Sequence, residues 1–179
     1  MRAITLAAAL LLSTTAANAT AAAPAAAPAA ITADPHAPKG KLPDGATPTA
    51  YRLDFTVLPE ADRFSGHDEI DVTLSRPVTS IYLHGRDLQM TRAVAMVGGQ
   101  AVAANWVQVD STGTARLDFP REIPAGSITL AFDYTAPFGD SASGMFHVKV
   151  ADKWYSWTQF ESIDARAAYP GFDEPGFKT

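Results

Sequence analysis

Apolar and polar residues alternate with a period of two through much of the chain, and this pattern limits the folds it can adopt. Between positions 51 and 57, tyrosine, leucine, phenylalanine and valine occupy every second position, with arginine, aspartate and threonine between them. Successive side chains of a β-strand point to opposite faces of a sheet, so this alternation is typical of a strand with one buried face. The pattern predicts an all-β fold, either an antiparallel sandwich or a large antiparallel sheet.

The alternation recurs at short intervals along the chain. We expect strands over residues 51–57, 69–74, 81–83, 94–97, 102–109, 115–119 and 128–134. Glycine and proline residues at 98–99, 113 and 124–126 predict the turns between several of them. The stretch from Pro59 to Gly66 predicts a hairpin connection, so the first two strands should pair antiparallel. A TonB-like or carbohydrate-binding β module also fits this pattern, because fold does not determine function.

The first part of the chain predicts export. Arg2 supplies positive charge, residues 3–12 are apolar, and Ala17-Asn18-Ala19 forms a cleavage site, which together indicate a secretory signal peptide over residues 1–19. Its apolar run is shorter than the ~20 residues that a membrane span needs. We therefore expect a periplasmic or extracellular protein with no membrane span after cleavage. Residues 20–41, rich in alanine and proline, predict a flexible linker, and the folded domain should occupy residues 42–179.

Charge and residue types argue against several classes of function. The 179 residues include 14 lysines and arginines against 19 acidic residues, a formal net charge of −5. This balance lacks the basic surface that binding to nucleic-acid phosphates requires, so no nucleic-acid partner is expected. The sequence has no cysteine, hence no disulfide and no thiolate ligand. None of the histidines, at positions 36, 67, 84 and 147, begins an H-E-x-x-H zinc motif, and we expect them on the surface or in loops.

The most specific motif lies near the carboxyl end. Residues 158–166 read TQFESIDAR and residues 169–178 read YPGFDEPGFK. Both resemble the pattern T-Q-F-E-P-x-D-A-R-x-x-F-P-C-x-D-E-P-x-F-K of the zinc aminopeptidases of the aminopeptidase N family. Ser162 and Gly171 stand where many members have proline and cysteine. Upstream residues also resemble the first two strands of the family's amino-terminal domain, so the resemblance covers residues 42–179.

The resemblance implies the amino-terminal domain of an exported zinc aminopeptidase, with a saddle-like antiparallel β fold. In the family, the zinc site lies in a catalytic domain that follows this one. We therefore expect zinc in a full-length parent but no metal site in this chain, and no peptidase activity from the chain alone. The sheet of the domain should be incomplete at its carboxyl end. The implied partners are peptide substrates and the catalytic domain of the same protein.

The resemblance also implies two substrate-binding residues. The family glutamate that matches Glu161 binds the α-ammonium group of the substrate, and the matching glutamine, here Gln159, lines the first subsite. A carboxylate in a partly desolvated slot suits this role, because its charge-assisted hydrogen bond to an ammonium group is strong and directional.

Four charged residues follow in the same motif. Paired carboxylates can act in general acid–base catalysis, but we expect a turn and an ion-pair network that fixes the loop carrying the two candidate binding residues. These four residues are Asp164, Arg166, Asp173 and Glu174. Just upstream, Trp154, Tyr155 and Trp157 are expected to pack in the core or against another domain.

Two further interpretations fit the sequence. The chain could be a non-catalytic exported β-sandwich that binds peptides or other partners. It could also be a truncated fragment without a function of its own. A stable monomer with a defined peptide affinity would favour the first interpretation, and poor solubility rescued by a longer chain would favour the second.

Overall fold

The computed structural model describes residues 30–177, and the predicted signal peptide lies outside them. Within this range the strands are β1 (Ala46–Thr56), β2 (Arg63–Leu74), β3 (Val78–His84), β4 (Gln89–Val97), β5 (Gln100–Ala103), β6 (Asn105–Gln108), β7 (Thr114–Ile123), β8 (Gly126–Pro137), β9 (Gly144–Val150) and β10 (Lys153–Gln159). Two short 3-10 helices follow, η1 (Asp164–Ala167) and η2 (Pro175–Phe177). No helix in the described range has the length and apolar character needed to cross a membrane.

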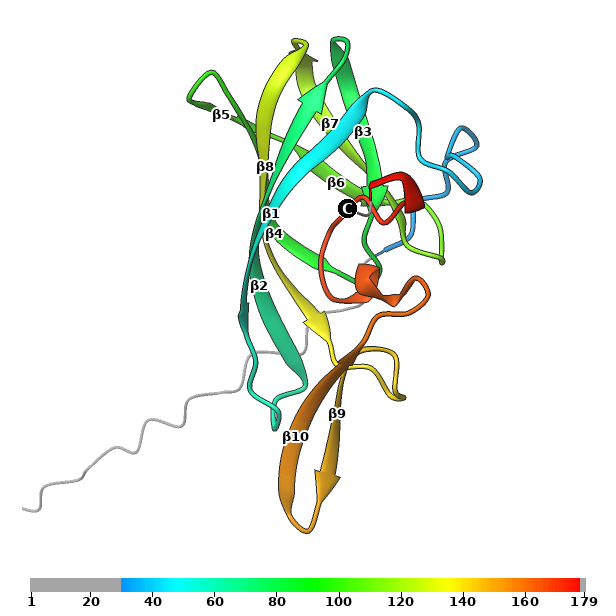
Figure 1. The fold of residues 1–179 in the computed structure, drawn as a ribbon, viewed down its shortest axis with the longest axis vertical. Coiled ribbons are helices and arrows are strands. Elements are labelled where there is room, and N and C mark those ends of the chain that lie inside the picture. The colour runs from blue at the N-terminus through cyan, green and yellow to red at the C-terminus, as the bar shows by residue number, and fades with distance from the viewer. Residues whose placement is uncertain (1–29, 178–179) are drawn as a thin grey trace, which may run out of the picture.

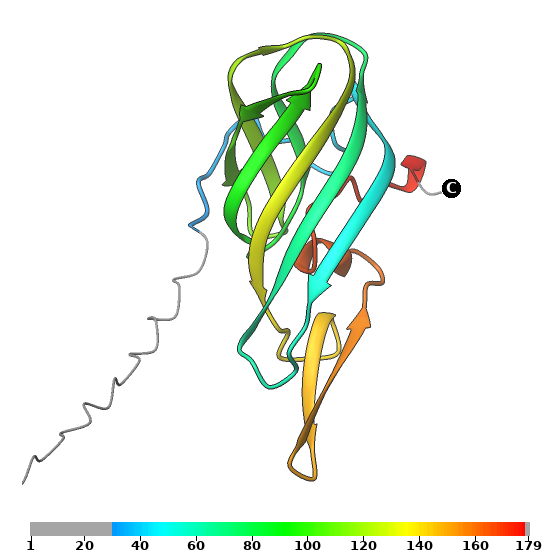
Figure 2. The same ribbon diagram turned by 90° about the vertical axis from the view of Figure 1, so that its left-hand side faces the viewer.

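The strands form three antiparallel sheets (Figures 1 and 2). The largest has five strands in the order β1-β2-β8-β4-β5, and the second has three in the order β3-β7-β6. The hairpin of β9 and β10 forms the third and extends away from the other two. The predicted all-β antiparallel fold is confirmed, and β1 pairs with β2 through the predicted connection, with Thr56 opposite Ser65.

The alternating pattern builds the core. In the central strands, Ile70 of β2 lies opposite Leu130 of β8, and neither side chain is accessible to solvent. Leu83 of β3 and Leu117 of β7 are equally buried and belong to the same apolar cluster. Each such side chain contributes about 1.5–3 kcal/mol when it leaves water. The two larger sheets are therefore held face to face by the apolar residues that occupy every second position of their strands.

The outer face of the five-stranded sheet is polar. Arg52 of β1 forms ion pairs with Glu69 at 2.7 Å and with Asp71 at 2.8 Å on β2. Further along this face, the His67 ring contacts Asp133 of β8 at 2.5 Å, and this contact raises the pKa of the His67 ring. Exposed pairs of this kind contribute at most about 1 kcal/mol each, so they make this face polar but add little to the stability of the fold.

The predicted strand over residues 102–109 is two strands in the structure. Val102 belongs to β5, which pairs with β4 in the five-stranded sheet, whereas Trp106 belongs to β6, which pairs with β7 in the other sheet. Between them, the Ala104 N–H donates to the carbonyl of Ala93 at 2.9 Å. The chain thus crosses from one sheet to the other within a single apolar run, and residue periodicity does not reveal such a crossing.

The second half of the expected linker, residues 30–41, contacts the three-stranded sheet. The Tyr82 hydroxyl donates to the carboxylate of Asp34 at 2.8 Å, and the Arg116 guanidinium forms an ion pair with the same carboxylate. The Thr32 N–H also donates to the Gln108 carbonyl at 2.9 Å. One acidic residue among the alanines and prolines therefore ties this stretch to the domain.

Gly66 of β2 allows an unusually close packing contact. It lies opposite Tyr134 of β8, and a Cβ atom at this position would be 2.4 Å from the tyrosine ring. Because β2 is paired on both sides, with β1 and β8, its backbone cannot move away without breaking the sheet. The glycine therefore creates the space in which the Tyr134 ring crosses β2.

We predict that Gly66→Ala lowers the free energy of unfolding by about 1–3 kcal/mol, because the added methyl group overpacks the site against the Tyr134 ring. Urea denaturation followed by tryptophan fluorescence measures the change. Gly176→Ala is the matched control, since a Cβ atom there meets nothing within 4 Å. Equal midpoints for the two variants would contradict the proposed packing role.

Candidate functional site

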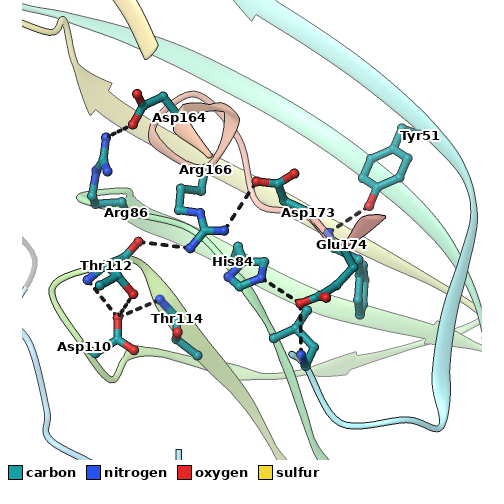
Figure 3. Close-up of polar contacts among 12 residues, drawn as sticks. Tyr51, His84, Arg86, Asp110, Thr112, Thr114, Asp164, Arg166, Asp173 and Glu174 are labelled. Atoms are coloured by element: carbon teal, nitrogen blue, oxygen red, sulfur yellow. Dashed lines mark hydrogen bonds and ion pairs between the residues drawn. The ribbon is translucent and has the colours of Figure 1, made fainter. Parts of the chain in front are cut away.

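The carboxyl-terminal motif of the sequence forms one continuous stretch, which we call the motif segment, residues 158–177. It leaves β10 and passes beside β3, as Figures 1 and 3 show. Its backbone joins β3 through a pair of hydrogen bonds between His84 and Gly171, with N···O distances of 2.7 and 2.8 Å. The Arg86 N–H also donates to the Arg166 carbonyl at 2.6 Å. These bonds fix the path of the segment along the domain.

Arg166 is the central cation of the motif segment (Figure 3). Its side chain is 7% exposed, donates to the Thr112 carbonyl at 3.2 Å, and pairs with Asp173 at 3.4 Å. Arg166 and Asp173, which the sequence analysis grouped together, are thus in contact. The middle of the segment is thereby attached to the loop between β6 and β7.

Asp164 has a different partner. Arg86, in the connection between β3 and β4, forms an ion pair with its carboxylate at 2.8 Å. A hydrogen bond from Ser143 and the Arg86 guanidinium hold the pKa of Asp164 below its usual value. The start of η1 is therefore attached to two loops that are distant in the sequence.

Glu174 joins the stretch just before β1 and the motif segment to β3. Its Oε1 atom accepts a hydrogen bond from the Leu42 N–H at 2.9 Å and lies 3.4 Å from Nε2 of His84. His84 is 3% exposed, so the expectation that it lies on the surface is wrong. Its position at the end of β3, under the motif segment, explains the burial. Desolvation, with a contribution from Arg166, lowers the pKa of the His84 ring.

Glu161 stands apart from these paired acids. It lies just after β10, is exposed, and no described residue donates a hydrogen bond to its carboxylate or pairs with it. Its backbone N–H donates to Oε1 of Gln159 at 3.3 Å, which keeps the two candidate binding residues side by side. Within the motif segment, Asp164, Asp173 and Glu174 are engaged in polar contacts, whereas the Glu161 carboxylate is available to a ligand.

Gln159 also belongs to an apolar face of the β9–β10 hairpin. Because side chains alternate along β10, Gln159 shares this face with Trp157 and Tyr155. Their partners across the hairpin are Phe146 and Val148. Trp157 is 59% exposed and Tyr155 is 45% exposed, so these two side chains do not pack in the core.

The opposite face of the hairpin attaches it to the domain. The His147 ring stacks between Phe138 and Trp154, with 4.5 Å between ring centroids on each side. Nδ1 of His147 lies 2.7 Å from the Pro59 carbonyl, which joins the hairpin to the β1–β2 turn. Trp154 itself remains 38% exposed and does not enter the core. Packing of the aromatic hairpin residues against another domain stays a prediction.

A cleft of ≈ 320 Å³ separates β1 from the motif segment. Tyr51 and Leu53 line it from the strand, and Tyr169 and Phe172 line it from the segment. The Tyr51 hydroxyl accepts a hydrogen bond from the Phe172 N–H at 2.9 Å. The predicted inner face of the first strand is therefore only partly covered, which leaves Tyr51 and Leu53 exposed to about 40%.

The described residues do not form a metal site. Within residues 30–177, no cluster of three or more histidine and carboxylate side chains is arranged to hold an ion. The paired carboxylates of the motif segment have protein partners, as described above.

Sequence reasoning missed Arg86 and His84 as parts of the site. Both follow a predicted apolar strand, and polar residues at the end of a buried strand were the available signal. Their partners could not be identified from spacing, because Arg86 and Asp164 lie 78 positions apart and His84 and Glu174 lie 90 apart.

Comparison with known proteins places the chain in a family. A family model for the peptidase M1 N-terminal domain matches residues 47–179. The chain is 31% identical over 147 residues to aminopeptidase N of Acetobacter pasteurianus, an alignment that covers 78% of this chain and 40% of that protein. It is 33% identical over 144 residues to aminopeptidase M1-D of Oryza sativa subsp. japonica, covering 78% of this chain and 16% of the relative.

A relative of lower identity also matches most of this chain over a small part of its own length. The puromycin-sensitive aminopeptidase of Caenorhabditis elegans is 27% identical over 145 residues, which cover 77% of this chain and 15% of that protein. The alignments thus cover between 15% and 40% of the length of these relatives. The family resemblance that the sequence motif predicted is confirmed, and the chain belongs to the peptidase M1 family, in the region of its N-terminal domain.

Proposed function

We propose that this chain is the amino-terminal part of an exported zinc aminopeptidase, in which Glu161 binds the α-ammonium group of peptide substrates. Similarity to aminopeptidases supports the class of reaction. The observation that carries the proposal is that the Glu161 carboxylate has no partner among residues 30–177, in a segment whose other acids have protein partners. An acid that stabilised the fold would be expected to have such a partner.

Desolvation would turn this weak site into a strong one. An exposed carboxylate gains little from an ion pair, because water screens both charges. If another part of the protein covers Glu161, the same contact strengthens as the local dielectric constant falls. Gln159 lies beside it and supplies an amide group to the same subsite. The exposed face of the hairpin, next to Gln159, is the surface that we expect to pack against the catalytic domain.

The paired residues act as the support for this site. Arg86, Arg166 and Glu174 attach the motif segment at separate points of the domain. A binding group held at several points is pre-organised, so less of the interaction energy is lost in ordering it. Zinc belongs, in this proposal, to a catalytic domain of the whole protein, and the predicted signal peptide supports export.

Glu161→Gln in the whole aminopeptidase should lower kcat/KM for substrates with a free amino terminus by about 30- to 5,000-fold. This range corresponds to the roughly 2–5 kcal/mol lost when one member of a buried charge pair is removed. Steady-state kinetics with aminoacyl chromogenic substrates measures the change. Because the free ammonium group is the proposed partner, the variant should also discriminate less between free and N-acetylated peptides.

Glu122→Gln is the matched control for this experiment. Glu122 is an exposed acid on β7, so the same charge is removed away from the motif segment. It should leave kcat/KM unchanged. Equal effects of the two substitutions, or full discrimination against acetylated peptides in Glu161→Gln, would rule out the assigned role.

Arg166→Ala should lower the free energy of unfolding by about 2–4 kcal/mol, because it leaves Asp173 and the Thr112 carbonyl without their buried partner. Chemical denaturation measures this change. Arg92→Ala removes an exposed pair with Asp133 and should cost no more than about 1 kcal/mol. If Glu161→Gln were as destabilising as Arg166→Ala, the division between binding and supporting residues would be wrong.

The 179-residue chain by itself should show no turnover of aminoacyl chromogenic substrates, since its described residues do not form a metal site.

The intact mass of the native protein, captured with an antibody against residues 51–178, tests whether the chain is part of a longer aminopeptidase. A species several times heavier than the chain is expected. A native mass equal to the short mature chain, together with peptide binding, would instead support the non-catalytic binding module.

A further inference from the structure

The hydroxyl of Tyr134 lies between two hydrogen-bond acceptors. Its Oη atom is 2.6 Å from Oδ2 of Asp68 and 2.8 Å from the carbonyl oxygen of Ala168. All three residues are buried, with 0–2% exposure. A phenol has a single proton to donate. Tyr134 therefore cannot donate to both acceptors at once.

Two hydrogen bonds at the Tyr134 hydroxyl require a second proton, and among these three residues only the Asp68 carboxyl group can supply it. The Ala168 carbonyl has none, so both short contacts are hydrogen bonds only if Asp68 is protonated. Asp68 then donates from Oδ2 to Tyr134, and Tyr134 donates to Ala168. Among the described residues, Oδ1 of Asp68 has no hydrogen-bond partner. An uncharged carboxyl tolerates this better than a carboxylate, because an unpaired buried charge is more costly.

We propose that Asp68 and Tyr134 form a proton-dependent clamp on the motif segment. When Asp68 is protonated, the clamp holds the backbone at Ala168, just after η1. When Asp68 is ionised, Tyr134 turns its O–H towards the carboxylate, and the Ala168 carbonyl loses its donor. Asp68 and Tyr134 are thus positioning residues for the segment that carries Glu161. The consequence for substrate binding rests on the function proposed above, whereas the clamp itself does not.

Burial sets the direction in which the pKa of Asp68 moves, against most of the groups that face it. Burial raises the pKa of Asp68 to about 6, whereas the Tyr134 hydroxyl lowers it, as does the backbone N–H of Asp54 on β1, which faces the carboxyl group without completing a hydrogen bond to Oδ1. His67, its neighbour on β2, lowers the pKa, and the Asp54 carboxylate raises it. From the motif segment, the Tyr169 hydroxyl also interacts with Asp68. Burial outweighs the lowering effects.

The sign of the pH dependence follows from this shift. The pKa of Asp68 is higher in the folded chain than its ordinary value of 3.8, so the folded state binds the proton more tightly than the unfolded state. The stabilising contribution of the protonated group is complete below pH 3.8 and is lost as the pH rises through about 6. The hydrogen bond from Tyr134 to the Ala168 carbonyl should therefore be lost as the pH rises through about 6.

Hydrogen exchange of residues 160–171 in the 179-residue chain tests the clamp between about pH 5 and pH 8, after correction for intrinsic exchange. Protection around Ala168 and Tyr169 should fall about five- to tenfold as the pH rises, the effect expected for losing one net hydrogen bond. Carbon-13 NMR of the Asp68 carboxyl group should show titration over the same interval.

Three variants separate the clamp from other causes. Asp68→Asn keeps an N–H donor towards Tyr134, so protection should become independent of pH. Tyr134→Phe should lose protection at every pH. His67→Gln removes a neighbouring titratable group, and the fall in protection should persist, with its midpoint at slightly higher pH because His67 lowers the pKa of Asp68.

Two results would overturn the clamp: a wild-type Asp68 carboxyl group that titrates below about pH 4, or a pH dependence of exchange that persists in Asp68→Asn. Neither result depends on catalysis. Failure of the proposed function would appear separately, in the kinetics of Glu161→Gln.

Discussion

The pairing of β2 with β8 is the constraint on which the rest of the structure depends. The two strands run antiparallel from Arg63 opposite Pro137 to Leu74 opposite Gly126, without a register shift. A slip of one residue would exchange the apolar and polar faces of a strand, so the burial of Ile70 fixes this register. The same register sets Gly66 opposite Tyr134 and so allows the tyrosine ring to reach the motif segment.

The site follows from the way this framework holds an irregular segment. A stretch with little regular structure needs partners for its buried polar groups, and the motif segment finds them in β3, β8 and the neighbouring loops. Asp164, Asp173 and Glu174 are used in these attachments. Glu161 has no such partner within residues 30–177, and for this reason we propose it, and not the other three acids, as the residue that binds substrate. The contacts of the four acids thus support the proposed division independently of the resemblance.

The sequence predicted the parts of the molecule that depend on local periodicity. The strand around Ile70 and its hairpin partner were found because alternation and a turn signal agree. The β9–β10 hairpin was missed because aromatic residues such as Trp154 and Tyr155 occupy adjacent positions and hide the period of two. The pair of Arg86 with Asp164 and the contact of Tyr134 with Ala168 depend on how distant segments meet, which no local pattern encodes.

Asp68 shows why a buried polar group can persist at a position that an apolar residue could fill. A well-packed apolar side chain often matches or exceeds the stability of a buried polar network. An apolar side chain at this position would leave Tyr134 free to donate its O–H to the Ala168 carbonyl at every pH. What the carboxyl group adds is a dependence on protonation: an ionised Asp68 takes the Tyr134 proton, and the Ala168 carbonyl is then a buried acceptor left unsatisfied, at a cost of about 1–3 kcal/mol. The proposed clamp therefore explains the carboxyl group by its control of a backbone that belongs to the segment carrying Glu161.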